Sequence, residues 1–96
     1  MRDFTIEKYR ELCLALLDGG YTPLTVYSYL NKELNTGKLV ILRHDIDRKP
    51  MNALKMAKLE HELGVKSTYY FRHVKDVFKP EIIEKIRDLG HEVGYH

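Results

Sequence analysis

Tryptophan is absent from the 96-residue chain, and cysteine and proline are scarce, with one and three residues. Because Cys13 is the single cysteine, the chain forms no internal disulfide and no metal site made of thiolates alone. No segment approaches the roughly 20 apolar residues of a membrane span. The first residues also lack the basic and apolar regions of a signal peptide. We therefore expect a cytoplasmic protein.

An excess of charge of one sign is also missing. Sixteen Lys and Arg residues stand against fourteen Asp and Glu, which gives a net charge of +2. The basic residues are scattered, so we expect neither a nucleic acid nor an anionic membrane as a partner. The content of 44% hydrophobic and 31% charged residues is typical of a folded domain rather than of a disordered chain. The length allows one domain and is far below the roughly 250 residues of a complete (β/α) barrel.

Residues 1–37 predict two amphipathic helices and contain no chemical motif. The first helix is expected from Thr5 to about Leu17, and the second is expected to open at Thr22–Pro23 and to end before Gly37. Cys13 falls on the apolar stripe of the first helix, so we interpret it as a small core residue. We treat this segment as an N-terminal helical extension.

Residues 38–96 alternate predicted strands with predicted helices. The expected strands and helices are, in order, 38–46, a helix from Pro50 to Gly64, 65–71, a helix from Pro80 to Gly90, and 91–96. The apolar run 39–42 is typical of a strand buried on both faces. This order predicts an α/β fold with a parallel βαβαβ sheet and right-handed crossovers, preceded by the two N-terminal helices. Because the last strand meets the end of the sequence, we expect a fragment of a longer domain.

The first candidate site is Arg43-His44-Asp45-Ile46-Asp47, at the carboxyl end of the first of these strands. Strand alternation directs Asp45 and Asp47 to one side and His44 and Ile46 to the other. The two carboxylates would then lie about 7 Å apart, close enough to share a cation. Carboxyl ends of parallel strands are where ligands bind in such folds. In a purely structural alternative, Asp47 caps the following helix and Asp45 pairs with a neighbouring arginine.

The second candidate site is the segment 90–96, which directly follows a predicted helix end. If His96 and Asp47 lie at the same end of nearby strands, their imidazole and carboxylate suit zinc or a similar divalent ion. A single histidine at a strand end is otherwise more often a hydrogen-bonded structural residue. Gly94 allows another group to approach the backbone closely. Arg72, after the middle strand, is a weaker candidate for contacting an anion or a substrate.

Three segments in this order resemble the NodB-homology polysaccharide deacetylase family. His-Asp-Ile-Asp, residues 44–47, resembles the first motif of the family in its Asp-x-Asp form. Ser-Thr-Tyr-Tyr-Phe, residues 67–71, resembles the second strand of that domain. Gly-His-Glu-Val-Gly-Tyr-His, residues 90–96, resembles the Gly-His-Glu-aliphatic-Gly-x-His segment of the family. The resemblance covers about residues 38–96.

The resemblance implies a metal-dependent hydrolase on an irregular (β/α) barrel, which removes acetyl groups from N-acetylated carbohydrates by cleaving C–N amide bonds other than peptide bonds. By position, Asp45 resembles the catalytic base, and Asp47 and His96 resemble two metal ligands. His91 resembles a residue that shapes its loop. A divalent ion is implied as cofactor, with zinc the expected one. The third ligand of the family would be a histidine four residues after His96, which the sequence does not contain.

The resemblance therefore implies the N-terminal part of a deacetylase-like domain. We expect residues 1–96 alone to be catalytically inactive, since the later strands and the third ligand are not in the sequence. An unpaired sheet edge could also let two copies of the chain form a homodimer.

Two other functions compete with this interpretation. A haloacid-dehalogenase-like phosphatase also has Asp-x-Asp after an apolar strand, with Asp45 as nucleophile, Asp47 as acid and magnesium beside them. That pattern expects Thr or Val where Lys49 stands, and it gives no role to His96. The other competitor is a non-catalytic α/β interaction module, for which replacing either aspartate by Asn would leave ligand binding unchanged.

Overall fold

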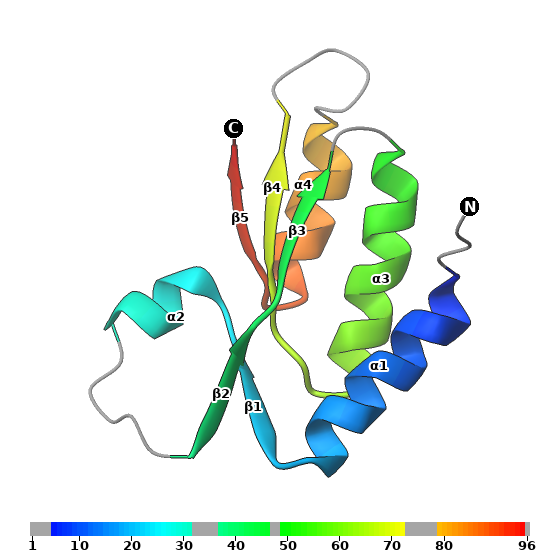
Figure 1. Cartoon of the computed structure of the whole chain (residues 1–96). Coiled ribbons are helices and arrows are strands. Elements are labelled where there is room, and N and C mark those ends of the chain that lie inside the picture. The colour runs from blue at the N-terminus through cyan, green and yellow to red at the C-terminus, as the bar shows by residue number, and fades with distance from the viewer. Residues whose placement is uncertain (1–4, 32–36, 47–48, 73–78, 96) are drawn as a thin grey trace.

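The structure is a computed structural model that describes residues 5–31, 37–46, 49–72 and 79–95. It contains helices and parallel strands that follow one another along the chain (Figure 1), which confirms the α/β class. The elements in chain order are α1 (Ile6–Asp18), β1 (Tyr21–Leu24), α2 (Val26–Asn31), β2 (Lys38–Ile41), β3 (Arg43–Ile46), α3 (Pro50–Glu62), β4 (Thr68–Phe71), α4 (Pro80–Asp88) and β5 (Glu92–Tyr95).

Strands β3, β4 and β5 form a parallel sheet in chain order, as the alternation of strands and helices predicted. Their register places Ile46, Phe71 and Tyr95 in one row at the carboxyl ends. All three strands run the same way, so that these ends meet at one edge, at the top of Figure 1. This is the edge at which the sequence predicted a site.

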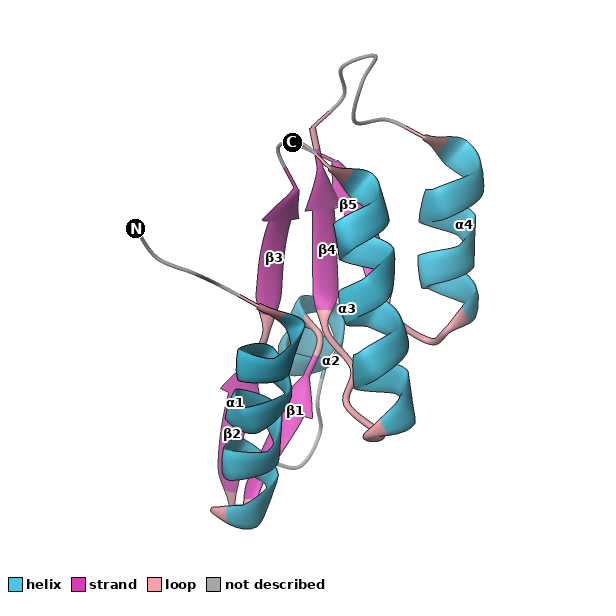
Figure 2. Cartoon of the chain, turned by 90° about the vertical axis from the view of Figure 1, so that its right-hand side faces the viewer, coloured by secondary structure: helices cyan, strands magenta, loops and turns pink. Residues whose placement is uncertain are grey.

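Helices α3 and α4 cover one face of this sheet, whereas α2 lies on the other side (Figure 2). Tyr69 and Phe71 of β4 point to the covered face and are fully buried. The core between sheet and helices consists of the buried residues Ile46, Ala53, Leu54, Ala57, Tyr69, Phe71, Ile83 and Ile86. Asp45, the aspartate of the candidate site that the structure describes, points to the opposite face of β3–β5.

The second predicted helix is wrong at its start, because Tyr21–Leu24 forms β1, parallel to β2. The residue before a proline is sterically held in an extended conformation, which favours a strand at Thr22. The helix begins later, at Val26, where Thr25 Oγ1 accepts a hydrogen bond from the backbone N–H of Ser28 (3.0 Å). Residues 32–36, where the helix was expected to continue, lie outside the described residues.

The predicted strand 38–46 is divided at Leu42 between two sheets. Its first half, β2, pairs with β1, and its second half, β3, pairs with β4. The expectation that the run 39–42 is buried on both faces is wrong, because Ile41 is 39% exposed. In the described residues β1 and β2 form a sheet of two strands only, which gives each strand little cover.

The other helices match their predicted positions. Thr5 caps α1 by accepting a hydrogen bond from the N–H of Lys8 (3.1 Å), and Pro50 and Pro80 open α3 and α4. Cys13 is 1% exposed, which confirms that it is a core residue. Strands β4 and β5 are shorter than predicted.

None of the described helices has the length and apolar character that crossing a membrane requires. Pairing of two copies at a sheet edge stays a prediction.

Candidate functional site

The carboxyl edge of the sheet brings together the residues that precede the predicted metal ligands. Ile46 and Tyr95 lie in one row, on β3 and β5. Asp47 and His96 follow them directly in the sequence and lie outside the described residues. Arg72 is exposed at the same edge, where its backbone N–H donates a hydrogen bond to the carbonyl of Ile46 (3.2 Å).

Asp45 points to the sheet face that α3 and α4 leave uncovered. Its carboxylate is about half exposed and accepts a hydrogen bond from Arg43 Nε (3.1 Å). The Arg43 guanidinium in turn lies over the Tyr70 ring, 4.7 Å from its centroid. An ion pair as exposed as this contributes about 0–1 kcal/mol, so Arg43 does not prevent Asp45 from binding another group.

The sequence also allowed a purely structural role for the two aspartates, and the structure confirms the part that concerns Asp45. Asp45 does pair with a neighbouring arginine, Arg43. The N-cap of α3, however, is Lys49, whose φ of 57° is left-handed and whose side chain makes no capping hydrogen bond. Asp47 lies outside the described residues, so its expected capping of this helix stays a prediction.

Gly94 lies beneath the Tyr70 ring on the same uncovered face. A Cβ atom at this position would be 2.7 Å and 2.8 Å from two carbons of that ring. The group that approaches the backbone here is thus a side chain of the chain itself. We predict that Gly94→Ala displaces Tyr70 and lowers the free energy of unfolding by about 1–3 kcal/mol in urea titrations. With Tyr70→Leu also present, most of this loss should disappear, and an unchanged loss would contradict the steric explanation.

The covered face holds a buried polar cluster, the Glu60 cluster, which comprises Tyr9, His44, Glu60, Ser67, Tyr69 and His91. Glu60, on α3, is fully buried. Its Oε1 accepts hydrogen bonds from Ser67 Oγ (2.7 Å) and Tyr69 OH (2.6 Å). Its Oε2 accepts hydrogen bonds from Tyr9 OH and from His44 Nε2 (2.9 Å). The carboxylate thus connects α1, β3, α3 and β4.

The donors of this cluster keep Glu60 ionised. Burial by itself raises the pKa of the Glu60 carboxyl, but the hydrogen bonds from His44 and from the two tyrosines outweigh burial and lower that pKa below its usual value. Burial, followed by the charge of the nearby carboxylate, raises the pKa of both Tyr9 and Tyr69. The two hydroxyls therefore stay protonated and donate to Glu60.

His91 is 3% exposed and has both ring nitrogens hydrogen-bonded within the chain. Nε2 donates to the carbonyl of Ala57 (2.9 Å), and Nδ1 accepts from the N–H of Ser67 (3.2 Å). Burial lowers the pKa of His91, so the ring is neutral at neutral pH. The imidazole links α3 to the residues before β4 and β5.

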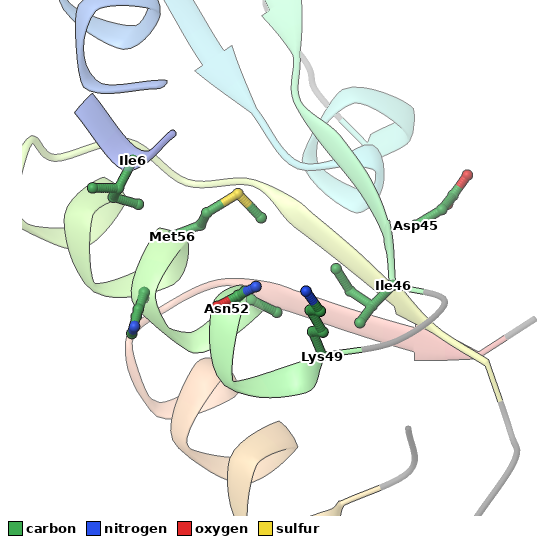
Figure 3. A pocket seen from close by; sticks show the side chains of 8 residues that line it. Ile6, Asp45, Ile46, Lys49, Asn52 and Met56 are labelled. Atoms are coloured by element: carbon green, nitrogen blue, oxygen red, sulfur yellow. The ribbon is translucent and has the colours of Figure 1, made fainter. Parts of the chain in front are cut away.

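A pocket of about 440 Å³ lies on the helix side of β3, between α1 and α3. Ile46, Lys49, Asn52 and Met56 contribute to its wall. Asp45 belongs to its rim, but its side chain points away from the others, to the far side of β3 (Figure 3). The carboxylate of the candidate base therefore does not face this pocket.

The Glu60 cluster was missed by the sequence analysis. One signal was available, because Glu60 falls at helical spacing from Ala53 and Ala57, on the buried side of α3. A charged residue on an apolar stripe indicates a buried, hydrogen-bonded carboxylate. Its partners Tyr9 and Ser67 could not have been found in this way, because they come from separate elements.

Comparisons with models of protein families, with curated proteins and with solved structures gave no match. In the part of the chain that the structure describes, no group of three or more His, Cys, Asp or Glu side chains is arranged to hold a metal ion. The candidate site therefore depends on Asp45 and on the row formed by Ile46 and Tyr95.

Proposed function

We propose that residues 38–96 form the first part of a metal-dependent amide hydrolase that deacetylates N-acetylated carbohydrates, with the sheet as part of an irregular (β/α) barrel. The observation that carries the proposal is the row formed by Ile46 and Tyr95, the residues that directly precede Asp47 and His96. Neighbouring strands are about 4.8 Å apart, and β4 lies between β3 and β5. The backbones of Ile46 and Tyr95 are therefore about 10 Å apart. Side chains from both strands can therefore meet over β4.

The donor set fits a divalent cation. A carboxylate from Asp47 and an imidazole from His96 suit zinc, and also iron or cobalt. When bound, such an ion would polarise an amide carbonyl and lower the pKa of a bound water molecule.

Asp45 is the residue we assign as general base. Its carboxylate faces the uncovered side of the sheet and stays accessible in spite of its pair with Arg43. It would accept the proton of an attacking water molecule as the oxygen bonds to the amide carbon. The C–N bond would then break, acetate would leave, and the sugar amine would take up the proton that Asp45 accepted, directly or through solvent. Arg72, exposed at the same edge, would contact polar groups of the substrate.

Zinc titration tests the ligand assignment. We expect Asp47→Asn and His96→Gln each to weaken Zn²⁺ binding at least ten-fold, about 1.4 kcal/mol, in isothermal titration calorimetry. Asp88→Asn and His61→Gln are matched controls, because both side chains are exposed and lie outside the site. They should leave the affinity within two-fold of that of the unsubstituted chain.

Two results would reject the proposal. One is that Zn²⁺, Fe²⁺ and Co²⁺ all fail to bind to the unsubstituted chain. The other is that the control substitutions weaken binding as much as those at Asp47 and His96. Either result would favour the non-catalytic interaction module.

A further inference from the structure

We propose that His44 is a positioning residue, held from the helix side by Glu60 and Tyr9, which fixes the carboxyl end of β3 and with it Asp45. The inference rests on the proposed function, because it assigns a role to the support of that site. It also gives the N-terminal helix α1 a part in the site, through Tyr9.

The first step is the alternation of side chains along β3. His44 and Ile46 point to the helix layer, where His44 is 16% and Ile46 is 7% exposed. Asp45, between them, points to the uncovered face and is about half exposed. Any rotation of the strand that moves His44 out of the helix layer must therefore also redirect Asp45.

The second step is that the His44 ring is held on several sides. Its Nε2 lies 2.9 Å from Glu60 Oε2 and 3.2 Å from the hydroxyl of Tyr9. The face of the ring packs against Tyr69, with 4.7 Å between centroids, and Tyr9 meets it edge-on at 5.5 Å. Since an ionised carboxylate can only accept hydrogen bonds, Nε2 of His44 carries a hydrogen and donates a hydrogen bond to Glu60.

The third step is that Glu60 is itself held in place. Ser67 and Tyr69 both donate to its other oxygen, Oε1. His91 Nε2, which donates to a backbone carbonyl, lies 3.7 Å from the same oxygen. Among the described side chains no buried polar atom lacks a hydrogen-bond partner. A carboxylate fixed by this many donors is a rigid anchor for the imidazole.

The fourth step is that β3 needs such an anchor. Within the described residues β3 has backbone pairing only with β4, so its other side has no strand ladder. Arg43 and Asp45, on the uncovered face, bond to each other in a solvent-exposed pair that contributes little. The orientation of the strand end therefore depends on His44 and Ile46.

The test compares His44→Met with His44→Gln. Gln can donate an amide N–H to Glu60 from nearly the position of Nε2, whereas Met has similar length and no donor. We expect His44→Met to shift the ¹³Cγ resonance of Asp45 in NMR spectra and to weaken Zn²⁺ binding at least ten-fold. Outer-shell partners of metal sites commonly have effects of about 10–100-fold. His44→Gln should leave the Asp45 resonance at its position in the unsubstituted chain and the Zn²⁺ affinity within two-fold of that chain.

Ile86→Val serves as the control for stability alone, because Ile86 is buried on α4, a helix that carries no residue of the Glu60 cluster. It should destabilise the chain without moving the Asp45 resonance. An unchanged Asp45 resonance and Zn²⁺ affinity in His44→Met would overturn the inference. So would a His44→Gln variant that is as impaired as His44→Met at equal stability.

Two further outcomes are separable. If His44→Met does not fold, Tyr9→Phe removes only the hydroxyl that contacts Nε2 and Glu60, and an unmoved Asp45 resonance in that variant overturns the inference. If the unsubstituted chain binds no Zn²⁺, the proposed function fails, and the Asp45 resonance alone then decides whether His44 positions the strand.

Discussion

Replacing Glu60 by Gln is expected to lower the free energy of unfolding by about 3 kcal/mol, because breaking a buried ionic network typically costs about 3–5 kcal/mol. The carboxylate accepts from donors at both oxygens. Gln has one carbonyl oxygen and an NH₂ group that must face one pair of those donors. If the NH₂ faces Ser67 and Tyr69, their hydroxyls must accept and their own protons lose the carboxylate as acceptor. If it faces Tyr9 and His44, the N–H of His44 loses its acceptor.

The matched control is Glu62→Gln, the same substitution two residues further along α3. Glu62 is exposed and reaches Arg10 only at 4.0 Å, so we expect a change within about 0.5 kcal/mol. Chemical unfolding followed by circular dichroism measures both variants. If Glu60→Gln were as stable as Glu62→Gln, the Glu60 cluster would not stabilise the fold, and the anchoring of His44 would lose its basis.

The sequence was sufficient for the elements that depend on local signals. Pro50 and Pro80 start helices because proline fits the first helical turn, and Gly64 and Gly90 follow their ends with positive φ. The alternation of strands and helices then required a parallel sheet in this part of the chain.

Elements fixed by distant partners were predicted poorly. β1 exists because Tyr21–Leu24 pairs with Lys38–Ile41, and a helix-start pattern at Thr22 gives no sign of that pairing. For the same reason the strand 38–46 divides at Leu42, where its partner changes from β1 to β4.

In the candidate site, too, features set by local sequence were predicted and features set by distant contacts were not. Alternation in a strand is local, and it correctly predicted that Asp45 lies opposite to Ile46. The contact of Glu60 with Tyr9 spans 51 residues, and its contact with His44 spans 16. Such contacts depend on how α1 and α3 pack on the sheet, which no spacing in the sequence specifies. The roles of Asp47 and His96 stay predictions.

Above pH 10 the chain is expected to lose stability steeply, because Tyr9 and Tyr69 resist ionisation in the folded state. Burial and the Glu60 charge raise the pKa of both hydroxyls above the ordinary tyrosine value of about 10. In the unfolded chain both hydroxyls ionise near pH 10, whereas in the folded chain both keep their protons. The two protonated tyrosines therefore contribute fully to the free energy of unfolding below about pH 10. Above about pH 10 that free energy falls by about 1.4 kcal/mol per pH unit for each tyrosine.

Urea unfolding between pH 9 and pH 11 measures this loss, and substitution separates it from the titration of lysines. Tyr9→Phe should reduce the slope of stability against pH by about half of the tyrosine contribution, since one of two ionisable hydroxyls is removed. Tyr27→Phe is the control, because Tyr27 is 64% exposed and should leave the slope unchanged. Equal slopes in all three proteins would mean that the Tyr9 hydroxyl ionises in the folded chain as readily as in water. In that case Tyr9 could not act as a permanent donor to Glu60, and the link from α1 to β3 would fail.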